Sequence, residues 1–85
     1  MIDYNELHDY EALAAAIIRV AAEDYKKAYK HRNSRTRGTR ERALEDQRIL
    51  EAFFRSGWFH FLTDVDGEYI MDRIKEEVDK EWQLR

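Results

Sequence analysis

The sequence predicts an all-α protein, and three observations carry that prediction. The 85 residues include no proline and three glycines, so few positions force a turn or resist a helix. The helix formers Ala, Glu, Lys, Arg and Leu are abundant. Apolar residues also recur at helical steps of three and four in separate stretches. We therefore expect a single domain over residues 1–85 with three to four helices: a long helical hairpin, an aromatic corner and a final helix.

The first helix is expected to begin near Asn5 and to end at about Lys30 or His31. Asp3 or Asn5 can cap its first turn. At about 1.5 Å per residue it is roughly 37 Å long, so the other helices should pack along it. Its apolar residues form one broad stripe and comprise Leu7, Tyr10, Leu13, Ala14, Ile17, Ile18, Val20, Ala21, Tyr25 and Ala28.

Residues 32–39 form the clearest linker, because Asn33 and Ser34 favour turns and Gly38 accepts a left-handed conformation. A second helix is expected from Thr39, its cap, to about Ser56. Because the linker is short, the first two helices should be antiparallel neighbours. The stripe of the second helix comprises Ala43, Leu44, Gln47, Leu50, Phe53 and Phe54.

An aromatic corner follows, because residues 53–69, FFRSGWFHFLTDVDGEY, hold six of the eleven aromatic residues of the chain. Gly57 is expected to end the second helix in a left-handed conformation. Residues 58–63 then form a short helical turn or a tight corner. The side chains expected in the core are Phe54, Phe61 and Leu62.

Three neighbouring residues of this corner, Trp58, Phe59 and His60, cannot all face inward, so at least one should be exposed. An exposed aromatic side chain at such a corner is a candidate for binding a partner. We take Trp58 and Phe59 as the two candidates.

The last helix is expected from Asp66 to Gln83, opened by a capping box between Thr63 and Asp66. Its apolar residues recur at steps of four, and they are Ile70, Ile74, Val78 and Trp82, with Tyr69 and Met71 beside them.

Charge is unevenly distributed along the chain. Residues 1–25 carry a net charge of −5, residues 26–42 carry +7, and residues 43–85 carry −5, which gives −3 in total. The basic band at 26–42 has two interpretations: it pairs with the acidic flanks, or it binds a partner. Arginines with nearby aromatic rings suit phosphate and base recognition, so nucleic acid or a nucleotide is a possible ligand. The candidate residues are Tyr29, Lys30, Arg32, Arg35, Arg37 and Arg40.

Other features argue against several function classes. The absence of cysteine excludes disulfides and Cys-ligated zinc and permits a reducing, intracellular location. The first residues, MIDYNELHDYE, are unlike a signal peptide, and the longest apolar run, residues 12–18, is shorter than the roughly 20 residues that a membrane span needs. No nucleophile triad, phosphate-binding glycine loop or metal-ligand spacing is evident. We expect a cytoplasmic protein that is not an enzyme and has no cofactor, no metal and no membrane association.

The run Phe53–Phe59, FFRSGWF, followed by Leu62-Thr63 and by DGEYI at 66–70, resembles a family of small proteins encoded by phages and prophages of Gram-positive bacteria. The family signature is FFRSxWFxxLTxxDGEY after a long Ala-rich helix, which AAEDY at 21–25 also resembles. The resemblance implies a phage setting and assigns no role to any residue as catalytic or otherwise.

Three functions are compatible with these features. The first is a non-enzymatic phage protein that binds and inhibits a host macromolecule, such as a CRISPR effector or another defence protein. The second is a nucleic-acid or nucleotide-binding accessory protein that uses the basic band, and the third is a structural adaptor in phage assembly or replication. The alanines of the first helix allow close helix approach, so we also expect a homodimer.

Overall fold

The computed structural model describes residues 4–83, with side chains from residue 9 onward. This part of the chain forms four helices and no strand, so the predicted all-α fold is confirmed. Because α1 already includes Asn5, that residue does not cap the helix, and Asp3 lies outside the described residues. The helices are α1 (Tyr4–His31), α2 (Arg37–Phe54), α3 (Gly57–Leu62) and α4 (Gly67–Gln83).

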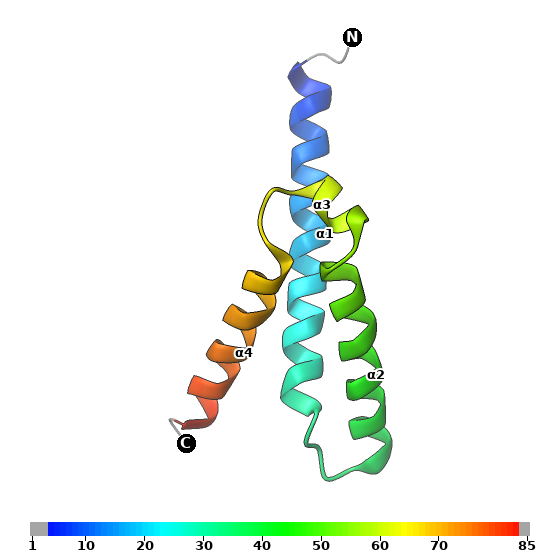
Figure 1. Ribbon diagram of the computed structural model, residues 1–85, viewed down its shortest axis with the longest axis vertical. Helices are drawn as coiled ribbons and strands as arrows, with labels where there is room; N and C mark the ends of the chain where they lie inside the picture. The colour runs from blue at the N-terminus through cyan, green and yellow to red at the C-terminus, as the bar shows by residue number, and fades with distance from the viewer. Residues whose placement is uncertain (1–3, 84–85) are drawn as a thin grey trace.

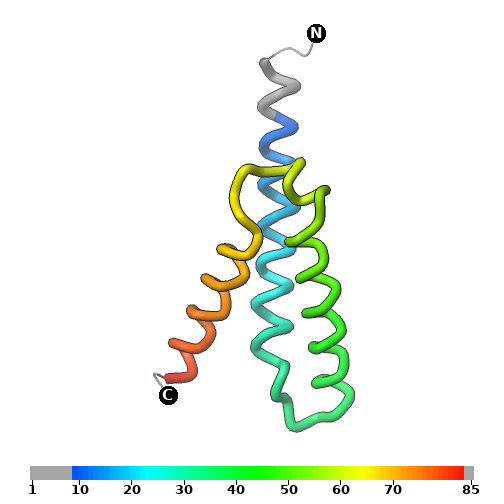
Figure 2. Tube along the Cα trace, in the orientation of Figure 1, coloured from blue at the N-terminus to red at the C-terminus, as the bar shows by residue number. Residues whose placement is uncertain are grey.

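The long helix α1 is the spine of the molecule (Figure 1). The helix α2 runs antiparallel along one side of it, as expected from the short linker, and α4 lies along another side. The short helix α3 crosses near the middle of α1, and the first turns of α1 extend beyond the other helices (Figures 1 and 2). The result is an elongated shape of 54 × 27 × 18 Å, with the first turns of α1 projecting at one end.

The turns around α2 differ from the prediction. The helix begins two residues before Thr39, with Thr36 as its N-cap residue, and Gly38 lies inside it. No described glycine has a positive φ, so the left-handed conformations expected at Gly38 and Gly57 are wrong. At the other end, the backbone N–H of Ser56 bonds to the carbonyl of Phe53 at 3.1 Å. Ser56 then caps α3 directly, so the chain needs no left-handed residue to leave α2.

The start of α4 also uses a simpler cap than the predicted capping box. Asp66 accepts a hydrogen bond from the backbone N–H of Glu68 at 3.1 Å. The Thr63 hydroxyl instead accepts from the backbone N–H of Val65 at 3.2 Å, because Thr63 is the C-cap residue of α3. The helix accordingly starts at Gly67.

The core lies where α1, α2, α3 and α4 converge. Small residues of α1, such as Ala21 and Ala28, are buried and let its neighbours approach closely. Ile74 on α4 is also buried, as its spacing predicted. The largest fully buried side chains are Tyr25, Phe54, Phe59, Met71 and Val78.

Phe61 corrects the predicted core, because it is 73% exposed. On a six-residue helix, Phe59 and Leu62 are three residues apart and share a face, whereas Phe61 points elsewhere. Phe59 is fully buried and Leu62 is half-buried on that inner face. The corner therefore places one phenylalanine in the core and turns the other outward.

Candidate functional site

The outer face of α3 carries two large aromatic side chains, Trp58 and Phe61, which we call the α3 aromatic pair. Their rings stack in nearly parallel planes, with centroids 6.1 Å apart and an interplanar angle of 5°. Trp58 is 61% exposed and Phe61 is 73% exposed. The pair presents apolar ring surface to solvent at one place on the molecule, which is unusual for side chains that normally bury most of their area.

Hydrogen bonds and ring contacts support the pair from beneath. The Ser56 hydroxyl accepts a hydrogen bond from the backbone N–H of Phe59 at 3.1 Å and donates one to the carbonyl of Phe53 at 2.7 Å. The ring of Phe59 packs edge-on against Phe53 and Phe54, at centroid distances of 5.7 and 5.5 Å. Phe59 is thus the anchor of α3 in the core. Phe59 is fully buried, so its prediction as a partner-binding residue is wrong, whereas Trp58 is exposed.

Behind α3, a buried tyrosine joins α1 to α2. The Tyr25 hydroxyl donates a hydrogen bond to Glu51 Oε2 at 2.8 Å, and Gln47 Nε2 donates to the same oxygen at 3.1 Å. Burial, the hydrogen bond and the Glu51 charge all raise the pKa of Tyr25. Burial opposes ionisation of Glu51 too, but hydrogen bonds from Tyr25 and Gln47 and the charges of Lys75 and Arg55 hold its pKa below the usual value.

A pH dependence follows from Tyr25. Since its pKa is raised in the folded state, its contribution to stability is complete below the unfolded pKa of about 10 and is lost as pH rises further. Tyr25→Phe should lower the free energy of unfolding by about 0.5–1.5 kcal/mol at neutral pH. Denaturant unfolding should show this difference shrinking at alkaline pH. The pKa of Tyr29 is also raised, but Tyr29 is present in both proteins, so its titration cancels in the comparison. A stability difference that stays constant with pH would therefore contradict the role given to the Tyr25 hydroxyl.

The part of the basic band on α1 pairs with acidic residues of α4. Lys30 Nζ lies 3.1 Å from Glu81, and Lys26 Nζ lies 3.3 Å from the same carboxylate. These two lysines hold the pKa of Glu81 below its usual value. The interpretation that the band pairs with the acidic flanks is therefore correct for Lys26 and Lys30.

Tyr29 and Arg32 belong to the same contact between helices. Arg32 lies 3.6 Å from Asp79 and its guanidinium sits 3.6 Å from the centre of the Tyr29 ring. Tyr29 is buried, and its hydroxyl donates to Asp79 at 3.1 Å. Both candidates thus hold α4 against α1 in this structure.

The rest of the band lies at the exposed tip between α1 and α2. Arg37 pairs with Glu41 on its own helix at 2.9 Å, and Arg40 donates to the Ser34 carbonyl at 3.3 Å. Arg35 makes no ion pair with any residue that the structure describes. These three arginines keep the solvent exposure expected for a binding surface.

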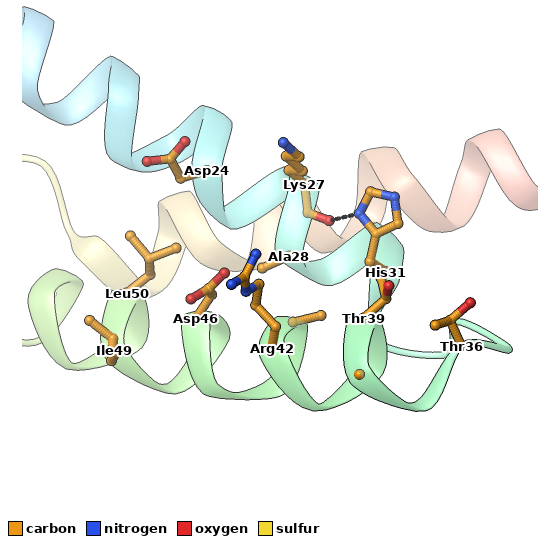
Figure 3. A pocket seen from close by; sticks show the side chains of 12 residues that line it. Asp24, Lys27, Ala28, His31, Thr36, Thr39, Arg42, Asp46, Ile49 and Leu50 are labelled. Atoms are coloured by element: carbon orange, nitrogen blue, oxygen red, sulfur yellow. Dashed lines mark hydrogen bonds between the residues drawn. The ribbon is translucent and has the colours of Figure 1, made fainter.

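Two grooves adjoin this tip. One lies between α1 and α2 and is lined by both apolar and charged side chains, including Lys27, Arg42 and Ile49 (Figure 3). In Figure 3, Asp24 and Lys27 point away from α2, and the ring nitrogen Nδ1 of His31 lies 2.9 Å from the Lys27 carbonyl. The other groove lies between the tip and the end of α4, and its lining includes Lys30, Arg32, Arg35, Asp79 and Trp82.

Two further findings concern the described residues alone. Among the side chains that the structure describes, residues 9–83, no group of three or more His, Cys, Asp or Glu is placed to hold a metal ion. None of the helices in this range combines the length and the apolar composition that a membrane crossing requires.

No protein-family model, curated protein or solved structure matches this chain.

Sequence reasoning missed two features of the site. Phe61 was assigned to the core, although its position three residues after Trp58 and two after Phe59 places it beside Trp58 on the opposite face. The position of Trp82 beside the arginine tip was also missed, because only the packing of α4 on α1 brings residue 82 near residues 30–35.

Proposed function

We propose that this chain is a non-enzymatic, phage-encoded protein that binds and inhibits a host protein, in particular a defence protein such as a CRISPR effector. The observation that carries the proposal is the α3 aromatic pair, two stacked rings that are mostly exposed. Tryptophan is enriched among the residues that dominate protein interfaces. The resemblance of residues 53–70 to a phage family supports the phage setting.

The construction of α3 favours binding. Its cap and the buried Phe59 ring hold the pair in one orientation before a partner arrives. A contact surface that is already ordered loses less conformational entropy on association than a flexible one. The arginine tip at Arg35, Arg37 and Arg40 would then attract an acidic partner and speed association rather than supply most of the affinity.

The test is a pull-down from a Gram-positive host lysate, quantified with the purified partner that it returns. Trp58→Ala with Phe61→Ala is expected to weaken binding by about 2 kcal/mol or more, the range for interface hot spots, which is a roughly 30-fold rise in Kd. Trp82→Ala is the matched control, since Trp82 is 55% exposed on another element. The complex should survive nuclease treatment. Equal binding by the double variant and the wild type would reject the α3 aromatic pair as the contact surface.

A second set of variants addresses the arginine tip. Arg35→Ser, Arg37→Ser and Arg40→Ser together should change stability little, by about 0–1 kcal/mol per residue, because these residues are exposed. Arg32→Ser is kept separate, because Arg32 pairs with Asp79 and its loss would disturb α4. Slower association of the triple variant with an unchanged dissociation rate would assign the tip to steering.

A second candidate function is nucleotide or nucleic-acid binding, and one observation favours it. The groove between the tip and α4 combines Arg32, Arg35 and the Trp82 ring, the pairing of cations and an aromatic surface that phosphates and bases require. ATP and a short single-stranded oligonucleotide are suitable probes, because a ligand that binds the folded state raises the melting temperature. A rise that Arg35→Ser and Trp82→Ala abolish would support this function, and no rise at millimolar probe would reject it.

A further inference from the structure

We propose that two copies of this chain form an antiparallel dimer through one face of α1, in which Asp9 of each copy pairs with Lys27 of the other. The surface, which we call the α1 outer stripe, comprises Asp9, Leu13, Ala16, Val20 and Lys27. These residues recur at steps of three, four and seven, which places them along one side of a helix.

The stripe is apolar in its middle, where Ala16 is half-buried and two larger side chains are exposed. Leu13 is 60% exposed and Val20 is 50% exposed, although both are large aliphatic side chains. The neighbours of α1 lie elsewhere around it: Lys26 and Lys30 on a different face reach α4, and Lys27 points away from α2 in Figure 3. Beyond α3, the first turns of α1 extend past the other helices (Figure 1). A second helix can therefore lie along the stripe.

The two ends of the stripe carry opposite charges that the monomer does not use. Neither Asp9 nor Lys27 makes an ion pair with another residue in the described part of the chain. They are 18 residues apart, which is five full turns, so they lie on the same line along α1. The midpoint between them is at the level of residue 18, and on the stripe this level falls between Ala16 and Val20. A two-fold axis that crosses the stripe there reverses the second helix and brings Asp9 opposite the partner's Lys27, at both ends of the dimer.

Charge also determines the direction of the pairing. A parallel arrangement would place Asp9 against the same carboxylate of the second copy, which is repulsive. The molecule already contains one contact of the proposed kind, since the acidic helix α4 packs on the basic half of α1 through Glu81 and Asp79. The N-terminal part of α1 is a second acidic segment that carries the exposed Leu13, and it would occupy the remaining side of that basic half in another copy.

The test uses charge reversal in the full chain, with the mass measured by light scattering and the Kd by sedimentation. The wild type should have twice the mass of one chain at micromolar concentration, and the dimer should weaken as salt screens its ion pairs. Asp9→Lys and Lys27→Glu each turn two attractive pairs into two repulsive ones, and each should raise the Kd by about tenfold or more. Both positions are exposed, so the circular dichroism of each variant should match the wild type.

Mixing the two single variants provides the decisive measurement. In the mixed dimer, Lys at position 9 of one variant faces Glu at position 27 of the other, and the native Asp9 faces the native Lys27. The mixture should therefore dimerise with a Kd near that of the wild type. The double variant within one chain should recover in the same way. Asp24→Asn should tighten the dimer slightly, because Asp24 lies one turn from Lys27 and would repel the partner's Asp9.

The apolar centre is tested with Leu13→Asn, which should weaken the dimer, and with Val65→Asn as the matched control, since Val65 is 47% exposed outside the stripe. A wild type with the mass of one chain at every concentration would overturn the proposal. A dimer whose Kd is unchanged by both charge reversals would also overturn it, and so would a mixture of the two variants that stays monomeric. None of these results bears on the α3 aromatic pair, which lies on a different helix.

Discussion

Replacing Phe54 with alanine is expected to lower the free energy of unfolding by about 3–5 kcal/mol, the range measured when a buried phenylalanine is truncated. Phe54 is fully buried at the end of α2. Its ring packs edge-on against Tyr25 of α1 at 5.9 Å and against Phe59 of α3 at 5.5 Å. One side chain thus joins three helices, and its removal leaves a cavity that rigid neighbours cannot fill.

The matched control for Phe54→Ala is Phe61→Ala. Phe61 is the same residue type seven positions later, but it is 73% exposed, so its truncation should change stability by less than about 0.5 kcal/mol. Thermal and denaturant unfolding of the two variants measure the contrast. Because a domain of this size has a total stability of only about 5–15 kcal/mol, Phe54→Ala can also abolish folding. Equal melting temperatures for the two variants would show that the core is elsewhere.

The second large effect is expected at Gly67, where alanine should destabilise the protein by about 1–3 kcal/mol, the range for overpacking a core. A Cβ atom at this position would lie 2.0 Å from the carbonyl oxygen of Phe54 and 2.9 Å from its carbonyl carbon. These are backbone atoms of α2, so no side-chain rotation can make room. The first turn of α4 would have to move away from α2 and disturb the ion pair between Arg55 and Glu68.

Gly57→Ala is the control for Gly67→Ala. Gly57 also begins a helix, but a Cβ atom there would meet nothing within 4 Å. Neither glycine has a positive φ, so alanine is compatible with both backbones. Gly57→Ala should raise the free energy of unfolding by about 0.4–1 kcal/mol, because alanine reduces the freedom of the unfolded chain. The two melting temperatures should move in opposite directions, and a rise for Gly67→Ala would refute the close approach.

The local sequence pattern was sufficient to predict the helices. The 3.6-residue period, the linker at 32–39 and the scarcity of glycine predicted a helical hairpin followed by a further helix, and the structure has these elements with ends that differ by a few residues. Those differences arise at the turns. At Gly38 and Gly57 the composition favoured left-handed residues, but hydrogen bonds from neighbouring backbone groups and the Ser56 cap close the turns without them.

Where several aromatic residues are adjacent, it was harder to predict which of them face the core and which face solvent. The sequence required that Trp58, Phe59 and His60 could not all be buried, and it offered Trp58 and Phe59 as candidate contact residues. It did not show that Phe59 would be the anchor and Phe61 the exposed ring. That choice depends on which face of α3 meets Phe53 and Phe54, and only the packed structure contains this contact.

The sequence by itself determined the helical class and the presence of a basic band between acidic flanks, because these depend on residue type and spacing along one chain. It predicted stripes broader than the core, since Leu13 and Val20 of the first stripe are exposed. Only the tertiary structure divided that band, tying Lys26, Lys30 and Arg32 to α4 and leaving the tip arginines exposed. Only the tertiary structure, likewise, shows that position 67 must be glycine. The physical reason is that atoms distant in the sequence neutralise these charges and leave no room for a Cβ atom at position 67. Those atoms come close only because whole helices pack together.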